Sequence, residues 1–176
     1  MLLNIGYSWG LKNIVILDVM IVASGFVLRA VAGALVIGVQ ASDWLILCTL
    51  SLALLISIGK RRQEIGMLAD RIGNHRATLS EYPLPYLDVL MAILASMTIM
   101  NYSLYAVSEH TIQLFGSNRL IWTVPTVFYG VARYLYLSFR HGEGGDPAKL
   151  LVTDRPTFVN ALLWTVTVCL VIYMRF

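Results

Sequence analysis

The chain has 176 residues, of which 58% are hydrophobic and 13% are charged, with a formal net charge of +3. Its mean hydropathy is +0.73. A soluble domain needs more polar residues for its surface, so this composition excludes an ordinary soluble globular protein. We expect an integral membrane protein that lies in the lipid bilayer and has no nucleic-acid partner.

Polar interruptions divide the sequence into five apolar segments, each close to the ~20 residues that a helix needs to cross a bilayer. In chain order the segments are residues 13–38, 43–59, 84–107, 119–139 and 157–175. The sequence therefore predicts a single all-α transmembrane domain over residues 1–176, a polytopic membrane helix bundle of five helices. Cytoplasmic loops are expected at 60–83 and 140–156.

The distribution of Lys and Arg predicts the orientation of this bundle. Nine of these residues lie on one side of the membrane: Lys12, five within 60–76 and three within 140–155. The opposite side carries only Arg119 and Arg175. Because positively charged loops stay in the cytoplasm, we expect the N-terminus inside and the C-terminus outside, in a bacterial cytoplasmic (inner) membrane.

The first apolar segment contains charged residues at helical spacing. Five residues at i, i+4, i+7, i+11 and i+15 share one helix face: Asp18, Val22, Gly25, Arg29 and Gly33. A charge as deep as Arg29 costs at least ~2.5–3.5 kcal/mol on insertion scales, so it should face a partner or a polar cavity. An internal ion pair, for example with Asp88, or a bond to backbone carbonyls is one interpretation. The wall of an anion-binding cavity is the other, and we favour it.

Three consecutive cations follow the second segment, within GKRRQE at residues 59–64. If the helix continues here, Arg61 and Glu64 share a face at i, i+3, and Lys60 pairs with Glu64 at i, i+4. A basic pair held by a carboxylate is a rigid donor array that suits phosphate oxygens. Ordinary anchoring by positive charge is the alternative.

The last inner loop, RHGEGGDPAKLLVTDRP, contains two expected helix caps. Asp146 precedes Pro147 and reads as an N-cap with Pro at the first helical position, while Asp154 reads as the cap of the fifth span. A Mg²⁺ role for Glu143 or Asp146 is a weaker alternative.

Three motifs occur in a characteristic order: YSWGLK at 7–12, GFVLRAVAG at 25–33 and GKRRQE at 59–64. Together they resemble the second half of a UbiA-superfamily membrane prenyltransferase. Within that superfamily they are most similar to the decaprenyl-phosphate phosphoribosyltransferases, whose motifs are Y-S-x-x-L-K, G-F-V-L-R-A-x-A-G and G-K-R-x-x-E. The resemblance covers essentially the whole chain.

The resemblance implies a fold of nine transmembrane helices around a central cavity, of which this chain would supply the last five. It also implies Mg²⁺, held on the diphosphate by an Asp-rich motif of the type N-D-x-x-D-x-x-x-D. That motif does not occur in these 176 residues. We therefore expect the main Mg²⁺ ligands outside this chain and assign no metal ligand within it.

The reaction implied by the resemblance joins 5-phosphoribosyl 1-diphosphate (PRPP) to decaprenyl or another polyprenyl phosphate and releases pyrophosphate. Lys12, Lys60 and Arg61 would contact phosphates. Glu64 would orient the cations, and Arg29 would reach toward the phosphate of the lipid. The K-R-x-x-E form of the second motif favours phosphoribosyl transfer over prenyl transfer to an aromatic acceptor, which is the alternative within the superfamily.

Alternatives of another class stay open on the sequence alone. The chain could be a non-catalytic membrane remnant or a partner subunit, and a small channel or transporter element is a third, weaker hypothesis. Because half of the helical ring and the Asp-rich motif are missing, we expect the chain alone to be inactive. Activity should require the missing N-terminal half, in the same chain or as a partner.

Overall fold

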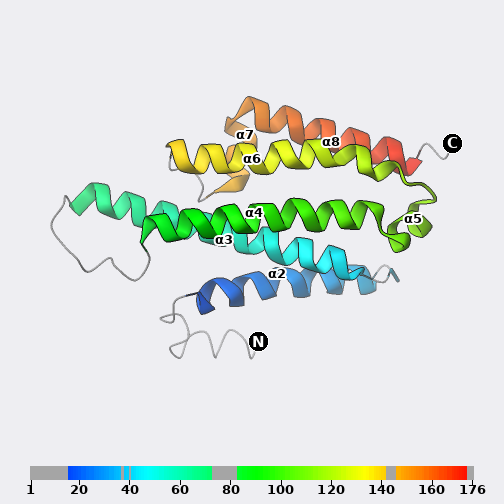
Figure 1. The fold of residues 1–176 in the computed structure, drawn as a ribbon, viewed down its shortest axis with the longest axis horizontal. Helices are drawn as coiled ribbons and strands as arrows, with labels where there is room; N and C mark the ends of the chain where they lie inside the picture. Colours follow the sequence, from blue (N-terminus) through cyan, green and yellow to red (C-terminus); the bar gives the residue numbers. More distant parts are fainter. Residues whose placement is uncertain (1–15, 37, 40, 73–82, 142–145, 174–176) are drawn as a thin grey trace.

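The protein is a bundle of long helices that alternate in direction (Figure 1). The computed structural model describes residues 16–36, 38–39, 41–72, 83–141 and 146–173, and within these ranges it has no strand. The elements are α2 (Leu17–Val36), α3 (Asp43–Ile72), α4 (Leu84–Val107), α5 (Glu109–Phe115), the 3₁₀-helix η2 (Arg119–Thr123), α6 (Val124–His141), α7 (Pro147–Thr153) and α8 (Arg155–Tyr173). The predicted all-α fold class is confirmed.

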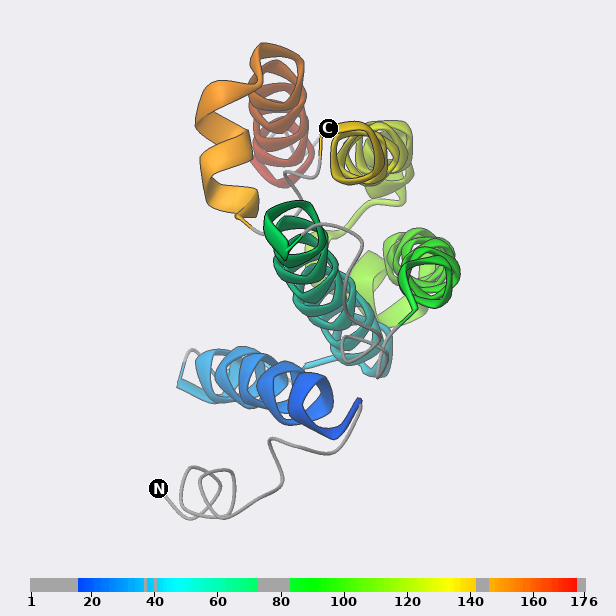
Figure 2. The ribbon, with the colours of Figure 1, turned by 90° about the vertical axis from the view of Figure 1, so that its left-hand side faces the viewer.

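Helix α3 is the centre of the arrangement, with α2 on one side and α4 on another (Figure 2). Helix α6 packs on α4, and α8 packs on α6 at the edge farthest from α2. The first turn of α2, the last turns of α3 and α6, the first turns of α4 and the whole of α7 lie at one end of the bundle (Figure 1). The described parts of the two basic segments within 60–76 and 140–155 therefore lie at that end.

Local sequence explains where several helices begin and end. Helix α4 follows Pro83 and gives way to α5 at Ser108, whose hydroxyl accepts a hydrogen bond from the N–H of Thr111. Gly116 ends α5 in the left-handed region at φ 69°, which only glycine adopts without strain. The caps expected at Asp146 and Asp154 are confirmed, because their carboxylates accept from the N–H groups of Lys149 and Thr157.

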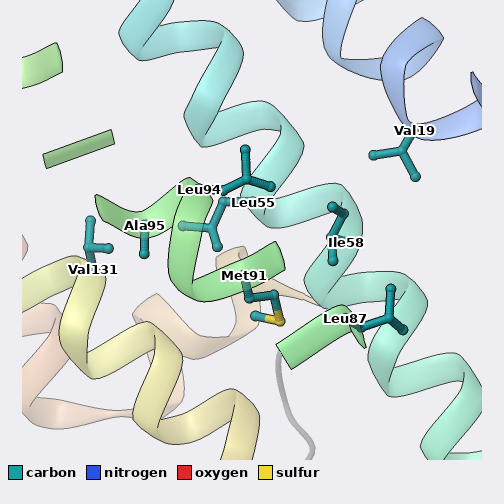
Figure 3. Packing of buried hydrophobic residues seen from close by; sticks show 8 residues of the cluster. All are labelled: Val19, Leu55, Ile58, Leu87, Met91, Leu94, Ala95 and Val131. Carbon is teal, nitrogen blue, oxygen red and sulfur yellow. The ribbon is translucent and has the colours of Figure 1, made fainter. Parts of the chain in front are cut away.

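The buried core joins α2, α3, α4 and α6 through side chains that meet between them (Figure 3). It consists of Val19, Leu55, Ile58, Leu87, Met91, Leu94, Ala95 and Val131. In a bilayer the surrounding lipid is as apolar as these side chains, so their close packing holds the helices together more than transfer out of water does. Helix α8 buries no residue in the bundle, as expected for a lipid-facing helix.

Two polar contacts fix α8 against its neighbours. A Cβ added at Gly130 would lie 3.1 Å from the side-chain nitrogen of Asn160, so this glycine gives Asn160 room to donate to the carbonyl of Thr126 at 2.9 Å. Farther along α8, the Trp164 indole donates to the Tyr102 hydroxyl at 3.1 Å. Such bonds are well suited to an apolar medium, where an unpaired polar group is costly.

Four of the five expected spans correspond to long apolar helices, and the fifth does not. Among the described residues, four helices are long and apolar enough to cross a membrane: Leu17–Val36, Asp43–Met67, Leu84–Val107 and Arg155–Tyr173. The span expected at 119–139 is divided into η2 and α6, and α6 is less apolar because it carries Arg133 and Arg140. Helix α6 nevertheless lies alongside α4 and α8 (Figure 1). A fifth crossing and the orientation of the bundle stay predictions.

The segment 60–83 was expected as a cytoplasmic loop, and its first part is helical. Helix α3 continues without interruption to Ile72. The conditional prediction that GKRRQE continues the second helix is thereby confirmed. Likewise, the segment 140–156 contains the short helix α7.

Candidate anion-binding site

A small pocket lies between the first turn of α2 and the last apolar turn of α3. Its volume is about 210 Å³, and it is lined by Asp18, Val19, Val22, Ser57, Lys60, Arg61 and Glu64. The helix places Lys60, Arg61 and Glu64 on this side because they recur at i, i+1 and i+4. Three of the five residues predicted for the site therefore come together.

Arg61 is held from two sides. Its Nη2 donates to Oδ2 of Asp18 on α2, and its Nη1 lies 3.6 Å from Oε2 of Glu64 one turn along α3. Asp18 is 8% exposed and stands in the first turn of α2, where the helix dipole favours a negative charge. Two carboxylates thus fix the direction of the guanidinium, which has five N–H donors and keeps several for another acceptor.

Lys60 differs from Arg61 in having no ion pair with any described residue. The i, i+4 pair expected between Lys60 and Glu64 is wrong, because Glu64 pairs with Arg61 instead. Lys60 is exposed at the pocket, so its ammonium is available to a ligand. The formal charges of the two cations and the two carboxylates of the pocket cancel. A multiply charged anion would therefore need further positive charge in order to bind.

Two predicted site residues are not placed in this pocket. Lys12 lies outside the described residues. Arg29 is on α2 and exposed, with its guanidinium 5.3 Å from the centre of the Phe26 ring. The interpretation that Arg29 pairs with Asp88 is wrong, because Asp88 forms its ion pair with Arg62. A role for Arg29 in a cavity wall stays a prediction.

The described residues do not fit a Mg²⁺ site of their own. Within the described ranges, no three side chains of His, Cys, Asp or Glu stand close enough together to hold a metal ion. The two carboxylates of the pocket, Asp18 and Glu64, are both directed at Arg61. Glu143, which was weighed as an alternative ligand, lies outside the described residues, and Asp146 is occupied as a helix cap.

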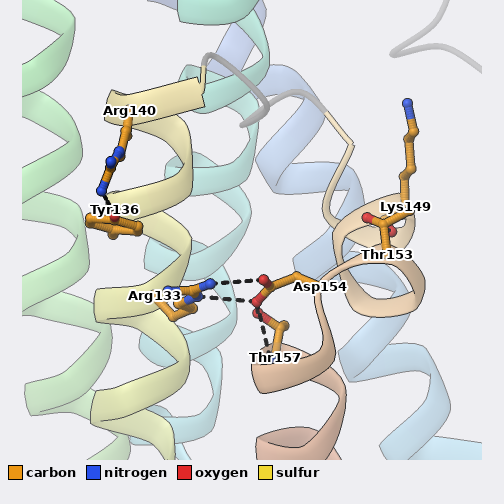
Figure 4. Close-up of polar contacts among 7 residues, drawn as sticks. All are labelled: Arg133, Tyr136, Arg140, Lys149, Thr153, Asp154 and Thr157. Atoms are coloured by element: carbon orange, nitrogen blue, oxygen red, sulfur yellow. Dashed lines mark hydrogen bonds and ion pairs between the residues drawn. The ribbon is translucent and has the colours of Figure 1, made fainter.

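A second charged cluster lies on the side of α6 that faces the start of α8 (Figure 4). Arg133 binds Asp154 through two hydrogen bonds of 3.1 and 2.8 Å, and the same carboxylate accepts from the N–H and hydroxyl of Thr157. The Arg133 guanidinium and the Thr157 donors hold the pKa of the Asp154 carboxyl well below its ordinary value. This pair joins α6 to the start of α8 and occupies both oxygens of the Asp154 carboxylate.

Sequence reasoning missed Asp18 as a member of the site and Arg133 as a brace. Asp18 was recognised only as part of the Arg29 face, although an acid in the first turn of a span, at the same expected membrane face as the basic run 59–64, was a usable signal. The Arg133–Asp154 pair has no such signal, because the two residues lie 21 positions apart on different helices.

The fold and the pocket together define a multi-pass α-helical membrane protein with a charged pocket in which carboxylates hold an arginine beside a lysine. No family model matches the chain. It is 31% identical over 175 residues to the decaprenyl-phosphate phosphoribosyltransferase of Corynebacterium glutamicum, covering 98% of this chain and 52% of that protein.

Enzymes of the same name from two other organisms are also similar. The protein from Mycolicibacterium smegmatis is 29% identical over 177 residues, and 97% of this chain and 55% of that protein are covered. The protein from Mycobacterium tuberculosis is 27% identical over 169 residues, with 94% and 54% covered. The resemblance to decaprenyl-phosphate phosphoribosyltransferases is confirmed, and the chain spans about half the length of these relatives.

Proposed function

We propose that this chain is part of a membrane transferase that moves 5-phosphoribose from PRPP to decaprenyl phosphate or another polyprenyl phosphate. In this reaction a phosphate oxygen of the lipid bonds to C1 of the ribose, while the bond from C1 to the diphosphate oxygen breaks. Pyrophosphate leaves. The observation that carries the proposal is the convergence of Lys60, Arg61 and Glu64 on one pocket.

The pocket would serve this reaction by binding phosphate oxygens before and during departure of the diphosphate. Lys60 offers a mobile ammonium, and Arg61 offers donors whose direction Asp18 and Glu64 fix. Preorganised cations lower the barrier because they need no reorientation when negative charge develops on the leaving group. The acceptor phosphate is already anionic and requires no general base.

The remainder of the site would come from outside the described residues. The four charged side chains of the pocket carry no net formal charge, whereas PRPP carries several negative charges. Lys12 and Mg²⁺ would supply the missing positive charge, with the main metal ligands in a half that corresponds to the rest of the relatives. The site would open to the cytoplasm of a bacterium, with the N-terminus inside and the C-terminus outside.

The test is a transfer assay with radiolabelled PRPP and polyprenyl phosphate in proteoliposomes. The chain is assayed alone and together with the corresponding N-terminal half of a relative. We expect labelled polyprenyl-phosphoribose only from the pair, and a loss of product in the pair when Lys60 and Arg61 are both replaced by Gln.

Two outcomes would argue for another function. Transfer of a prenyl group to an aromatic acceptor by the pair would favour the other type of UbiA enzyme. No product from any combination, although the two halves co-purify, would favour a non-catalytic partner subunit.

A further inference from the structure

The third cation of the basic run has a different environment from the other two. Arg62 follows Lys60 by two residues, which is about 200° around an α-helix, so it leaves α3 on the side opposite the pocket. Its Nε donates to Oδ1 of Asp88 on α4, and its Nη1 donates to the backbone carbonyl of Ser138 on α6 at 2.8 Å. The guanidinium also stacks on Phe139, 5.0 Å from the ring centre.

The Ser138 carbonyl belongs to the last turn of α6, which ends at His141, and carbonyls of a last turn accept from groups outside the helix. A cation there also complements the negative end of the helix dipole. The Arg62 side chain is 16% exposed, so the contacts with α4 and α6 are largely shielded from solvent.

Arg62 thereby sets the rotation of α3 about its own axis. A helix turned about its axis carries all its side chains with it, and Lys60, Arg61 and Glu64 belong to the same two turns. With Arg62 attached to α4 and α6, those three residues face α2 and Asp18. Lysine could replace this only in part, because an ammonium keeps the charge but lacks the planar fork that binds carboxylate and carbonyl together.

We propose that Arg62 is a positioning residue for the anion-binding pocket: it touches no substrate and aims Lys60 and Arg61 by fixing the end of α3 against α4 and α6. This inference rests on the proposed function for its effect on the reaction. Its effect on the geometry of the pocket does not depend on that function. The three cations of the run then have different roles. Lys60 is a free ligand group, Arg61 is a ligand group held by two carboxylates, and Arg62 fixes the helix against its neighbours.

The first experiment measures geometry on the chain itself. Cys48 and Cys169 are replaced by Ala, and Ser57, which lines the pocket, is replaced by Cys. We expect Arg62→Gln and Asp88→Asn each to change the rate of maleimide labelling at this position severalfold. Arg133→Gln is the matched control, because it breaks an inter-helix Arg–Asp pair on the other side of α6, and it should leave the rate unchanged.

The second experiment measures the reaction in the assembled pair of halves. Arg62→Gln should raise the KM for PRPP about tenfold, Arg62→Lys should restore part of the loss, and Arg133→Gln should leave KM unchanged. The losses from Arg62→Gln and Arg61→Gln should not add in the double variant, because one residue acts through the other.

The results separate the two proposals. Altered labelling without any transferase activity would support the clamp and remove the proposed reaction. Labelling in Arg62→Gln and Asp88→Asn that equals the parent would overturn the clamp, whatever the activity. Additive losses in the double variant would overturn the claim that Arg62 acts through Arg61.

Discussion

Of the three Arg–Asp pairs among the described residues, Arg61–Asp18 and Arg133–Asp154 lie on opposite sides of the bundle and differ in what they leave free. Asp154 accepts two hydrogen bonds from Arg133 and two more from the N–H and hydroxyl of Thr157, and its side chain is 15% exposed. Arg61 is shared between Asp18 and Glu64, Glu64 is 51% exposed, and Lys60 beside them is unpaired among the described residues. The same residue types form a closed brace in one place and an open donor array in the other.

The largest effect that this difference predicts is on transfer activity. In the assembled pair of halves, Arg61→Gln should lower kcat/KM by about 10²–10³-fold, the size found when one preorganised donor is removed from a developing anion. The measurement is product formation from labelled PRPP at equal amounts of folded protein. Arg133→Gln is the control. A comparable loss of activity in that variant would show that the Arg133–Asp154 pair matters for the reaction as much as the pocket does.

The next effect concerns Arg29 on the uncovered face of α2. Among the described residues, no atom beyond the chain neighbours and the backbone of α2 lies within 4 Å of a Cβ added at Gly25 or Gly33 on that face, so the face is open there. For the chain alone, Arg29→Leu should favour membrane insertion by about 2.5–3.5 kcal/mol on insertion scales, measured with a glycosylation reporter. For the assembled halves it should lower activity instead. Unchanged activity there would show that Arg29 is no part of the cavity wall.

How far the sequence predicts this structure depends on the range of the interaction. The caps at Asp146 and Asp154 are local and were foreseen, and the continuation of α3 through the basic run, which is also local, was predicted only conditionally. The partners of Arg62 and the absence of an Arg29–Asp88 pair were not, because they depend on how each helix is rotated against its neighbours. Spacing along one helix shows which residues share a face but not which helix that face meets.

A smaller effect is expected on the free energy of unfolding when the Arg133–Asp154 pair is changed. Asp154→Ala removes the N-cap of α8 and should lower the free energy of unfolding by about 1 kcal/mol, whereas Asp154→Asn keeps a capping side chain and should cost less. Thermal unfolding in detergent, followed by circular dichroism, measures both. Equal losses in the two variants would mean that the charge of Asp154, and not its capping, matters.

The smallest effect is a dependence on pH. The pKa of Asp154 is lowered from 3.8 by Arg133 and Thr157, so the folded state binds the proton less readily than the unfolded state does. The stabilisation is therefore complete above pH 5 or so and declines as the pH falls below about 4, toward the folded-state pKa. The difference in unfolding temperature between the parent and Asp154→Asn should shrink over that acidic range. A difference that grows on acidification would contradict this assignment.

The most direct test of the α2–α3 pocket as the phosphate site is protection from labelling by PRPP. In the assembled halves, cysteine-free except for Ser57→Cys, PRPP should slow maleimide labelling saturably, and the protection should disappear in Lys60→Gln and Arg61→Gln. A cysteine at Lys149, in the polar pocket beside the Arg133 brace, should label at the same rate with and without PRPP. Protection at Lys149→Cys together with none at Ser57→Cys would show that the phosphates bind at the brace and not between α2 and α3.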